Sequence, residues 1–182
     1  MPCAPGLFRP KGDNFALGVN KFSQGIGDFL APASGTPRLP GGRGGRTLGR
    51  MAQARPRPRP RRIAIADDSP AFVSAVSTYV ESLPGYELAG TARTSVQAME
   101  LVEAQLPDVL LLDLGLPPMR GLDFVRRLKA LPGGPAVVAM TLFHTPEAAA
   151  EARRAGADAL VGKEAFVSGL NQALAKLFPA AA

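Results

Sequence analysis

The chain has 182 residues, a formal net charge of +6, one cysteine and one histidine. The single cysteine, Cys3, excludes an internal disulfide, and with His144 as the sole histidine a zinc site built from Cys and His ligands is excluded. No apolar run approaches the roughly 18 residues of a membrane span, and the N-terminus lacks the apolar segment of a secretory signal. We therefore expect a soluble, cytoplasmic protein with no membrane span.

The basic charge is confined to the first third of the chain. Residues 1–62 hold 12 of the 21 Lys and Arg residues against two acids, a charge of +10, whereas residues 63–182 hold nine against 13, a charge of −4. The first part also contains low-complexity stretches such as RPRPRPRR and shows neither helical nor strand periodicity. We expect residues 1–60 to be a disordered basic tail rich in Pro, Gly and Arg.

Two interpretations of this tail remain open. Its arginines could bind nucleic acid or another polyanion through release of counterions. Alternatively, residues 1–50 are not translated and the protein starts at Met51, just before the folded region.

From residue 61 onward, apolar runs alternate with amphipathic segments. Ser69-Pro70 and Thr145-Pro146 predict the N-caps and first turns of two helices, and Thr94 with a glutamine three residues later predicts a capping box for another. In chain order the expected elements are strand 62–66, helix 70–82, strand 86–92, helix 95–105, strand 108–113, helix 122–131, strand 136–141, helix 146–155, strand 158–162 and helix 165–178.

The strands consist of continuous apolar runs, which indicates a parallel sheet that is buried on both faces. Five strand–helix units in succession predict an α/β fold with a doubly wound five-stranded parallel sheet and flanking helices. We expect this domain to cover residues 61–178, followed by a short C-terminal tail over 179–182.

Charged and polar residues follow the ends of the predicted strands. Asp67 and Asp68 come after the first strand, Asp113 ends the third, Thr141 ends the fourth, and Lys163 follows the fifth. Because right-handed crossovers place every strand's carboxyl end at one edge of the sheet, we expect these side chains to converge there.

Three neighbouring carboxylates repel one another unless a cation offsets their charge. Hard oxygen ligands without His or Cys favour Mg²⁺ or Mn²⁺. An aspartate beside such an ion could attack a phosphoryl group and form an aspartyl phosphate. Lys163 could then balance charge on the phosphoryl oxygens, and the Thr141 hydroxyl could donate a hydrogen bond to them.

Together these motifs resemble the response-regulator receiver domain of two-component signalling in bacteria. The matching residues are the acidic pair Asp67-Asp68, Asp113 in LLLDLGLP, Thr141 in VVAMT and Lys163 in GADALVGKE. The resemblance implies a flavodoxin-like strand order of 2-1-3-4-5. It also implies that Asp113 accepts a phosphoryl group from a histidine kinase or a phosphotransfer protein. Thr141 and Lys163 would assist that chemistry.

The resemblance further implies a metal site. Asp68, Asp113 and the backbone carbonyl of Gly115 would bind Mg²⁺ or Mn²⁺ directly, and Asp67 would act through a metal-bound water. A haloacid-dehalogenase-type phosphatase would need a second aspartate where Gly115 stands, so that enzyme class is disfavoured.

Four positions depart from the family pattern. Leu160 replaces the usual aromatic switch residue, and Glu164 replaces a common proline. Arg120 stands where an acidic residue is usual, and Leu142 is bulkier than the small residue typical after the threonine. We expect these changes to affect phosphorylation kinetics and output, and to leave the chemistry of the carboxylates and lysine intact.

The expected function is that of a stand-alone receiver, not an enzyme, which signals by phosphorylation-dependent protein binding. Its partner face would comprise helix 146–155, strand 158–162 and helix 165–178, with Phe143 and Leu160 nearby. The alternatives are a pseudo-receiver that is not phosphorylated and a nucleic-acid-associated regulator that acts through the basic tail.

Overall fold

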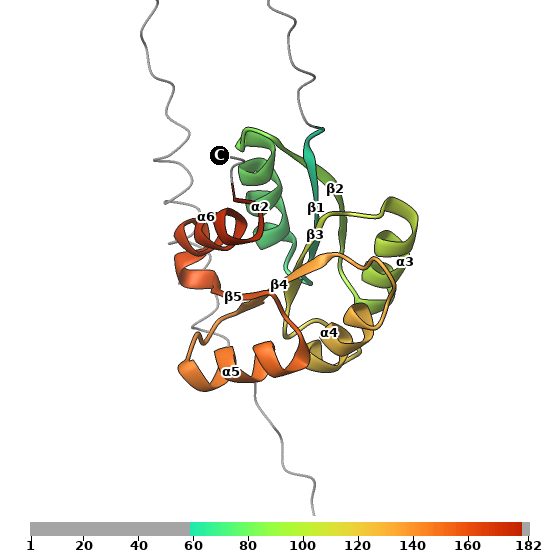
Figure 1. Ribbon diagram of the computed structural model, residues 1–182, viewed down its shortest axis with the longest axis vertical. Coiled ribbons are helices and arrows are strands. Elements are labelled where there is room, and N and C mark those ends of the chain that lie inside the picture. Colours follow the sequence, from blue (N-terminus) through green and yellow to red (C-terminus); the bar gives the residue numbers. More distant parts are fainter. Residues whose placement is uncertain (1–58, 180–182) are drawn as a thin grey trace, which may run out of the picture.

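The computed structural model describes residues 59–179 and shows a central sheet with helices on both faces (Figure 1). The five strands are parallel and lie in the order β2-β1-β3-β4-β5. Both the doubly wound fold and the strand order are therefore confirmed. Their bounds are β1 Arg61–Ala66, β2 Tyr86–Ala92, β3 Val109–Asp113, β4 Ala136–Thr141 and β5 Ala159–Gly162.

Helices follow each strand, as the alternating pattern predicts. They are α2 Pro70–Ser82, α3 Ser95–Gln105, α4 Gly121–Lys129, α5 Pro146–Ala155 and α6 Phe166–Leu177, with a 3-10 turn, η1, over Lys163–Ala165. None of these helices has the length and apolar character that a membrane crossing requires. The predictions of a disordered tail over residues 1–60, of a start at Met51 and of a short C-terminal tail over residues 179–182 fall mostly on residues 1–58 and 180–182, which lie outside the described residues, and they stay predictions.

Two apolar cores form because the sheet is covered on both faces. Successive strand residues alternate between them. Ile63 and Ile65 of β1 belong to the core beneath α2 and α6, whereas Ala64 and Ala66 belong to the core beneath α3, α4 and α5. Burial on both faces explains why these strands are continuous apolar runs in the sequence.

The predicted helix caps are present. Ser69 Oγ accepts a hydrogen bond from the backbone N–H of Phe72, and Thr145 Oγ1 accepts one from that of Ala148. Thr94 Oγ1 accepts from Gln97 N, but the Gln97 side chain bonds the N–H of Arg93 rather than that of Thr94. These caps fix where each helix starts relative to the strand end that precedes it.

At the amino-terminal edge of the sheet, arginines next to the tail converge on one carboxylate. The guanidinium of Arg59 donates to both oxygens of Asp108 at 3.0 Å, and the backbone N–H of Arg62 donates to Oδ2 at 2.8 Å. The Arg62 guanidinium also bonds the carbonyl and side chain of Gln105, the last residue of α3. The last residues of the basic segment thus belong to the fold.

This carboxylate should stabilise the fold in a pH-dependent way. Burial alone would raise the pKa of Asp108, but the hydrogen bonds from Arg62 and Arg59 outweigh it and hold the pKa below its usual 3.8. A lowered pKa stabilises the folded state above about pH 4, and this contribution is lost as the pH falls further. We expect Asp108→Asn to lower the free energy of unfolding by about 1–3 kcal/mol at pH 7, measured by urea denaturation. The difference from wild type should narrow below about pH 4, and a difference constant with pH would contradict this account.

Candidate functional site

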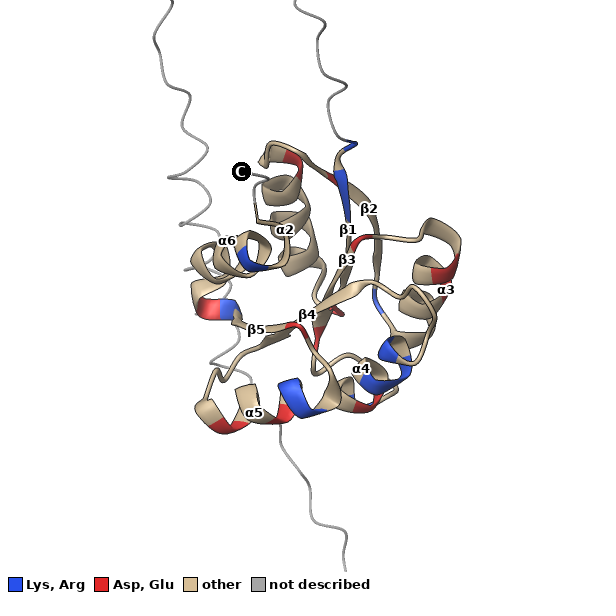
Figure 2. Ribbon diagram, in the orientation of Figure 1, with Lys and Arg blue, Asp and Glu red and all other residues tan. Residues whose placement is uncertain are grey.

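Parallel strands bring the predicted acidic residues to one edge of the sheet (Figure 2). β1 is followed directly by Asp67 and Asp68, and β3, which pairs with β1, ends at Asp113. Lys163 follows the last residue of β5. Asp67, Asp113 and Lys163 are buried, whereas Asp68 is exposed.

The ammonium group of Lys163 lies between two of these carboxylates. Lys163 Nζ is 2.6 Å from Asp67 Oδ2 and 3.0 Å from Asp113 Oδ1. The side chain of Lys163 is only 8% exposed, so little water screens these ion pairs. Its Nζ also lies 4.8 Å from the centre of the Phe72 ring, in range of a cation–π contact. The ammonium group of Lys163, which follows β5, therefore joins the carboxylates at the ends of β1 and β3.

The environment of Asp67 disfavours its charged form. Complete burial raises the pKa of Asp67, and the attraction of Lys163 and the N–H of Ser69 offset this only in part. The neighbouring charge of Asp113 adds to the rise. A second positive charge beside Asp67 would stabilise its ionised form, so this environment favours the binding of a further cation.

The carboxylates are close enough to share a metal ion. One oxygen from each of Asp67, Asp68 and Asp113 lies within 4.8 Å of the others. This donor set consists of hard oxygens only, which fits Mg²⁺ or Mn²⁺. The exposed Asp68 faces solvent, as an ion that keeps several waters requires.

Gly115 lies close to the carboxylate of Asp113. The backbone N–H of Leu116 donates to the carbonyl of Asp113 at 3.2 Å, which closes a tight turn after β3. A Cβ added at Gly115 would lie 3.0 Å from Asp113 Oδ2, so glycine lets the backbone run next to the carboxylate. The role of the Gly115 carbonyl as a metal ligand stays a prediction.

Thr141 lies at the same edge, but its side chain bonds within its own loop. Thr141 pairs with Gly162, the residue before Lys163. Its Oγ1 accepts a hydrogen bond from the backbone N–H of Phe143 at 3.2 Å. Its hydroxyl donates a long hydrogen bond of 3.5 Å to the carbonyl of Phe143, and it would have to leave this acceptor to donate to a phosphoryl group.

Three contacts at the site could not be predicted from the sequence motif. The Phe72 ring lies against Lys163, the N–H of Ser69 donates to Asp67 Oδ1 at 3.0 Å, and Arg93 donates to the carbonyl of Asp68 at 3.3 Å. Phe72 is recognisable in the sequence only as an apolar position of α2. Its proximity to an ammonium group depends on the packing of α2 against β1.

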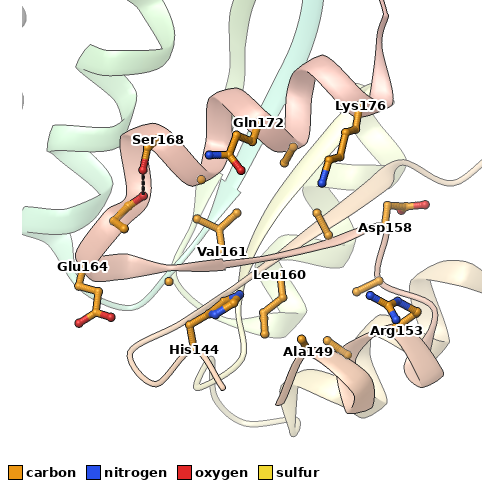
Figure 3. A pocket seen from close by; sticks show the side chains of 17 residues that line it. His144, Ala149, Arg153, Asp158, Leu160, Val161, Glu164, Ser168, Gln172 and Lys176 are labelled. Carbon is orange, nitrogen blue, oxygen red and sulfur yellow. Dashed lines mark hydrogen bonds between the residues drawn. The ribbon is translucent and has the colours of Figure 1, made fainter. Parts of the chain in front are cut away.

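A groove of about 550 Å³ lies between α5, β5 and α6, on the predicted partner face (Figure 3). Leu160, at the usual aromatic position, lines this groove and packs on the second core. His144 also lines the groove and lies beside Leu160 in Figure 3; a Cβ added at Gly162 would be 3.2 Å from His144 Cβ, so glycine leaves room for His144 there. Phe143 is 79% exposed and so belongs to neither core.

These features define a class of protein: a doubly wound α/β domain with an acidic cluster and a buried lysine at the carboxyl edge of its sheet. A family model described as the response regulator receiver domain matches residues 63–175. The chain belongs to this family, and it carries a receiver domain of two-component response regulators.

Curated relatives also match this part of the chain. A protein-glutamate methylesterase/protein-glutamine glutaminase 1 from Caulobacter vibrioides is 33% identical over 117 residues, which cover 64% of this chain and 34% of the relative. A similarly named protein from Vibrio vulnificus is 38% identical over 81 residues, covering 44% of this chain and 24% of the relative. The chain thus spans about a quarter to a third of these relatives.

These relatives correct one prediction. From its sequence, the chain is predicted not to be an enzyme. That prediction is wrong as a statement about its relatives, because the curated proteins that the chain matches are named as enzymes. It rested on the receiver motifs alone. Such motifs describe the phosphoacceptor edge and carry no information about the domain to which a receiver is joined.

Solved structures agree on the fold. A two-component response regulator of the LuxR family from Aurantimonas sp. SI85-9A1 has a TM-score of 0.60 at 28% identity, covering 65% of this chain and 85% of that one. The signal receiver domain of the putative response regulator NarL from Mycobacterium tuberculosis has a TM-score of 0.59 at 26% identity, covering 65% and 96%.

The acidic cluster should bind a divalent ion measurably. We expect Mg²⁺ at a hundredfold excess over its Kd to raise the free energy of unfolding by about 2.7 kcal/mol. Asp68→Asn should weaken this effect strongly, whereas Glu103→Gln, an exposed acid on α3, should not. The Mg²⁺ affinity should also fall as the pH is lowered towards the raised pKa of Asp67, because protons then compete with the metal for this carboxylate. Equal Mg²⁺ stabilisation in both variants, measured by denaturation, would contradict the assignment.

Proposed function

We propose that the receiver domain accepts a phosphoryl group on Asp113 and signals through its phosphorylation-dependent surface. One observation carries the proposal: Lys163 Nζ is buried within 3.0 Å of Asp113 Oδ1 while also paired with Asp67. An aspartate paired only to maintain the fold would not need a second carboxylate and an exposed third one beside it.

The chemistry follows from the groups at the edge. A carboxylate oxygen of Asp113 attacks the phosphorus of a phosphohistidine, the P–N bond breaks, and the electron pair leaves with the imidazole nitrogen. Lys163 balances the negative charge on the phosphoryl oxygens. Asp67, Asp68, Asp113 and the Gly115 carbonyl would hold Mg²⁺ or Mn²⁺, which neutralises further charge on the phosphoryl group when bound.

The donor would be a histidine kinase or a phosphotransfer protein, and the output would be a change at the groove between α5, β5 and α6. The loop after β4 supports this link, because Thr141 accepts from the N–H of Phe143 and the next residue, His144, lines the groove. If the Thr141 hydroxyl turns to the phosphoryl group, the Phe143 amide loses its partner and the loop is free to shift.

The acceptor residue can be tested with a small phosphoryl donor. The full chain incubated with acetyl phosphate and Mg²⁺ should gain one acid-labile phosphoryl adduct by mass spectrometry. Asp113→Asn should abolish the adduct, and Asp123→Asn, at an exposed position of α4, should retain it. An unmodified wild type would indicate a pseudo-receiver, and an adduct that persists in Asp113→Asn would place the acceptor elsewhere.

The link to the groove can be tested separately. With beryllofluoride as phosphoryl mimic, we expect NMR shifts at the amides of Phe143 and His144 in the wild type. Thr141→Val should still bind the mimic but lose these shifts, because valine cannot hydrogen-bond either the loop or the mimic. Identical shifts in Thr141→Val would show that the loop responds by another route.

A further inference from the structure

A second hollow lies on the other side of α5. It has a volume of about 560 Å³, opens between α4 and α5, and is lined among others by Arg120, Leu122, Asp123, Arg126, Glu151 and Arg154. Figure 2 shows basic segments on both of these helices, which pack against each other. We call this site the α4–α5 hollow.

The charge at this hollow differs from that of the domain around it. Residues 63–182 carry a net charge of −4, yet three arginines and only two acids line the hollow. One arginine is already paired, since Arg126 bonds Asp123 at 2.6 Å. Within residues 59–179, the guanidinium groups of Arg120 and Arg154 have neither an ion-pair nor a hydrogen-bond partner. Two exposed cations are therefore available on opposite walls, one before α4 and one on α5.

The hollow is also built against the phosphoacceptor loop. Leu114, the residue after Asp113, forms part of its lining. A Cβ added at Gly121 would lie 2.4 Å from Leu114 Cα, so the start of α4 is packed tightly onto this backbone. A molecule bound in the hollow would contact the loop that follows Asp113 without covering the carboxylates themselves.

The lining selects among anionic partners. A nucleic acid presents an unbroken row of phosphates, which Asp123 and Glu151 would repel, and the hollow's lining contains no aromatic side chain for base stacking. A protein segment can instead place carboxylates against Arg120 and Arg154 and an apolar side chain against Leu122. Arginine pairs carboxylates in two-pronged geometry, which favours such a segment.

We propose that the α4–α5 hollow is a docking site for a partner protein segment that carries acidic side chains around an apolar one. This surface is separate from the groove between α5, β5 and α6, and its occupation does not require phosphorylation. α5 contributes to both sites, with Arg153 facing the groove and Arg154 facing the hollow.

The test uses the full ¹⁵N-labelled chain and a short synthetic peptide of glutamates around a central leucine. Residue-resolved NMR shifts separate the hollow from the basic N-terminal segment, which will also attract an acidic peptide. We expect saturable shifts at the amides of Leu114, Gly121 and Arg154 that weaken as salt is raised. The same peptide with glutamines in place of glutamates should produce none.

Matched variants locate the site. Arg120→Ala with Arg154→Ala should weaken peptide binding at the hollow about five- to tenfold, as expected for the loss of two exposed ion pairs. Arg127→Ala with Arg153→Ala removes the same charge from α4 and α5 at positions outside the hollow, and it should leave binding at the hollow nearly unchanged. The proposal is overturned if both pairs weaken binding equally, if the wild type shows no localised shifts, or if a single-stranded oligonucleotide shifts the same amides at lower concentration.

Discussion

The arrangement of the site depends on a single buried cation between two carboxylates. Lys163 leaves the end of β5 and reaches Asp67 after β1 and Asp113 at the end of β3. Because little water reaches this site, the attraction between Lys163 and the two carboxylates is strong. It offsets part of the cost of burying both acids and fixes the distance between the two strand ends. It also leaves the site short of positive charge, since two acids surround one ammonium group and Asp68 adds a third. This excess of negative charge favours the binding of a divalent ion. Under the proposed function, that ion and Lys163 together would balance the negative charge of a phosphoryl group.

Much of this architecture can be predicted from the sequence because it arises locally. Apolar runs between capping signals give the strands and helices to within two residues, and Ser69, Thr94 and Thr145 cap helices as expected. Right-handed crossovers then determine which strand ends meet. Asp67, Asp68, Asp113 and Lys163 were consequently predicted to converge, and the structure brings them together.

The remaining features depend on packing that no local pattern reports. The motif gives Asp67 and Asp68 different expected roles but does not indicate their burial: Asp67 is fully buried against Lys163, whereas Asp68 faces solvent. The bidentate contact of Arg59 with Asp108 joins residues far apart in the chain, so a segment that looks like low-complexity tail up to residue 60 ends inside the fold. Likewise, the receiver motifs could not reveal that the relatives they match are enzymes.

The central claim is that Asp113 and the acids around it hold a metal ion and a phosphoryl group against Lys163. A crystal structure of the full chain with Mg²⁺ and beryllofluoride tests it most directly. The account predicts beryllofluoride on a carboxylate oxygen of Asp113, Lys163 Nζ against its fluorines, and Mg²⁺ held by Asp68, Asp113 and the Gly115 carbonyl. A structure in which Mg²⁺ lies away from these acids, or in which beryllofluoride is absent from Asp113 at saturating concentration, would contradict it.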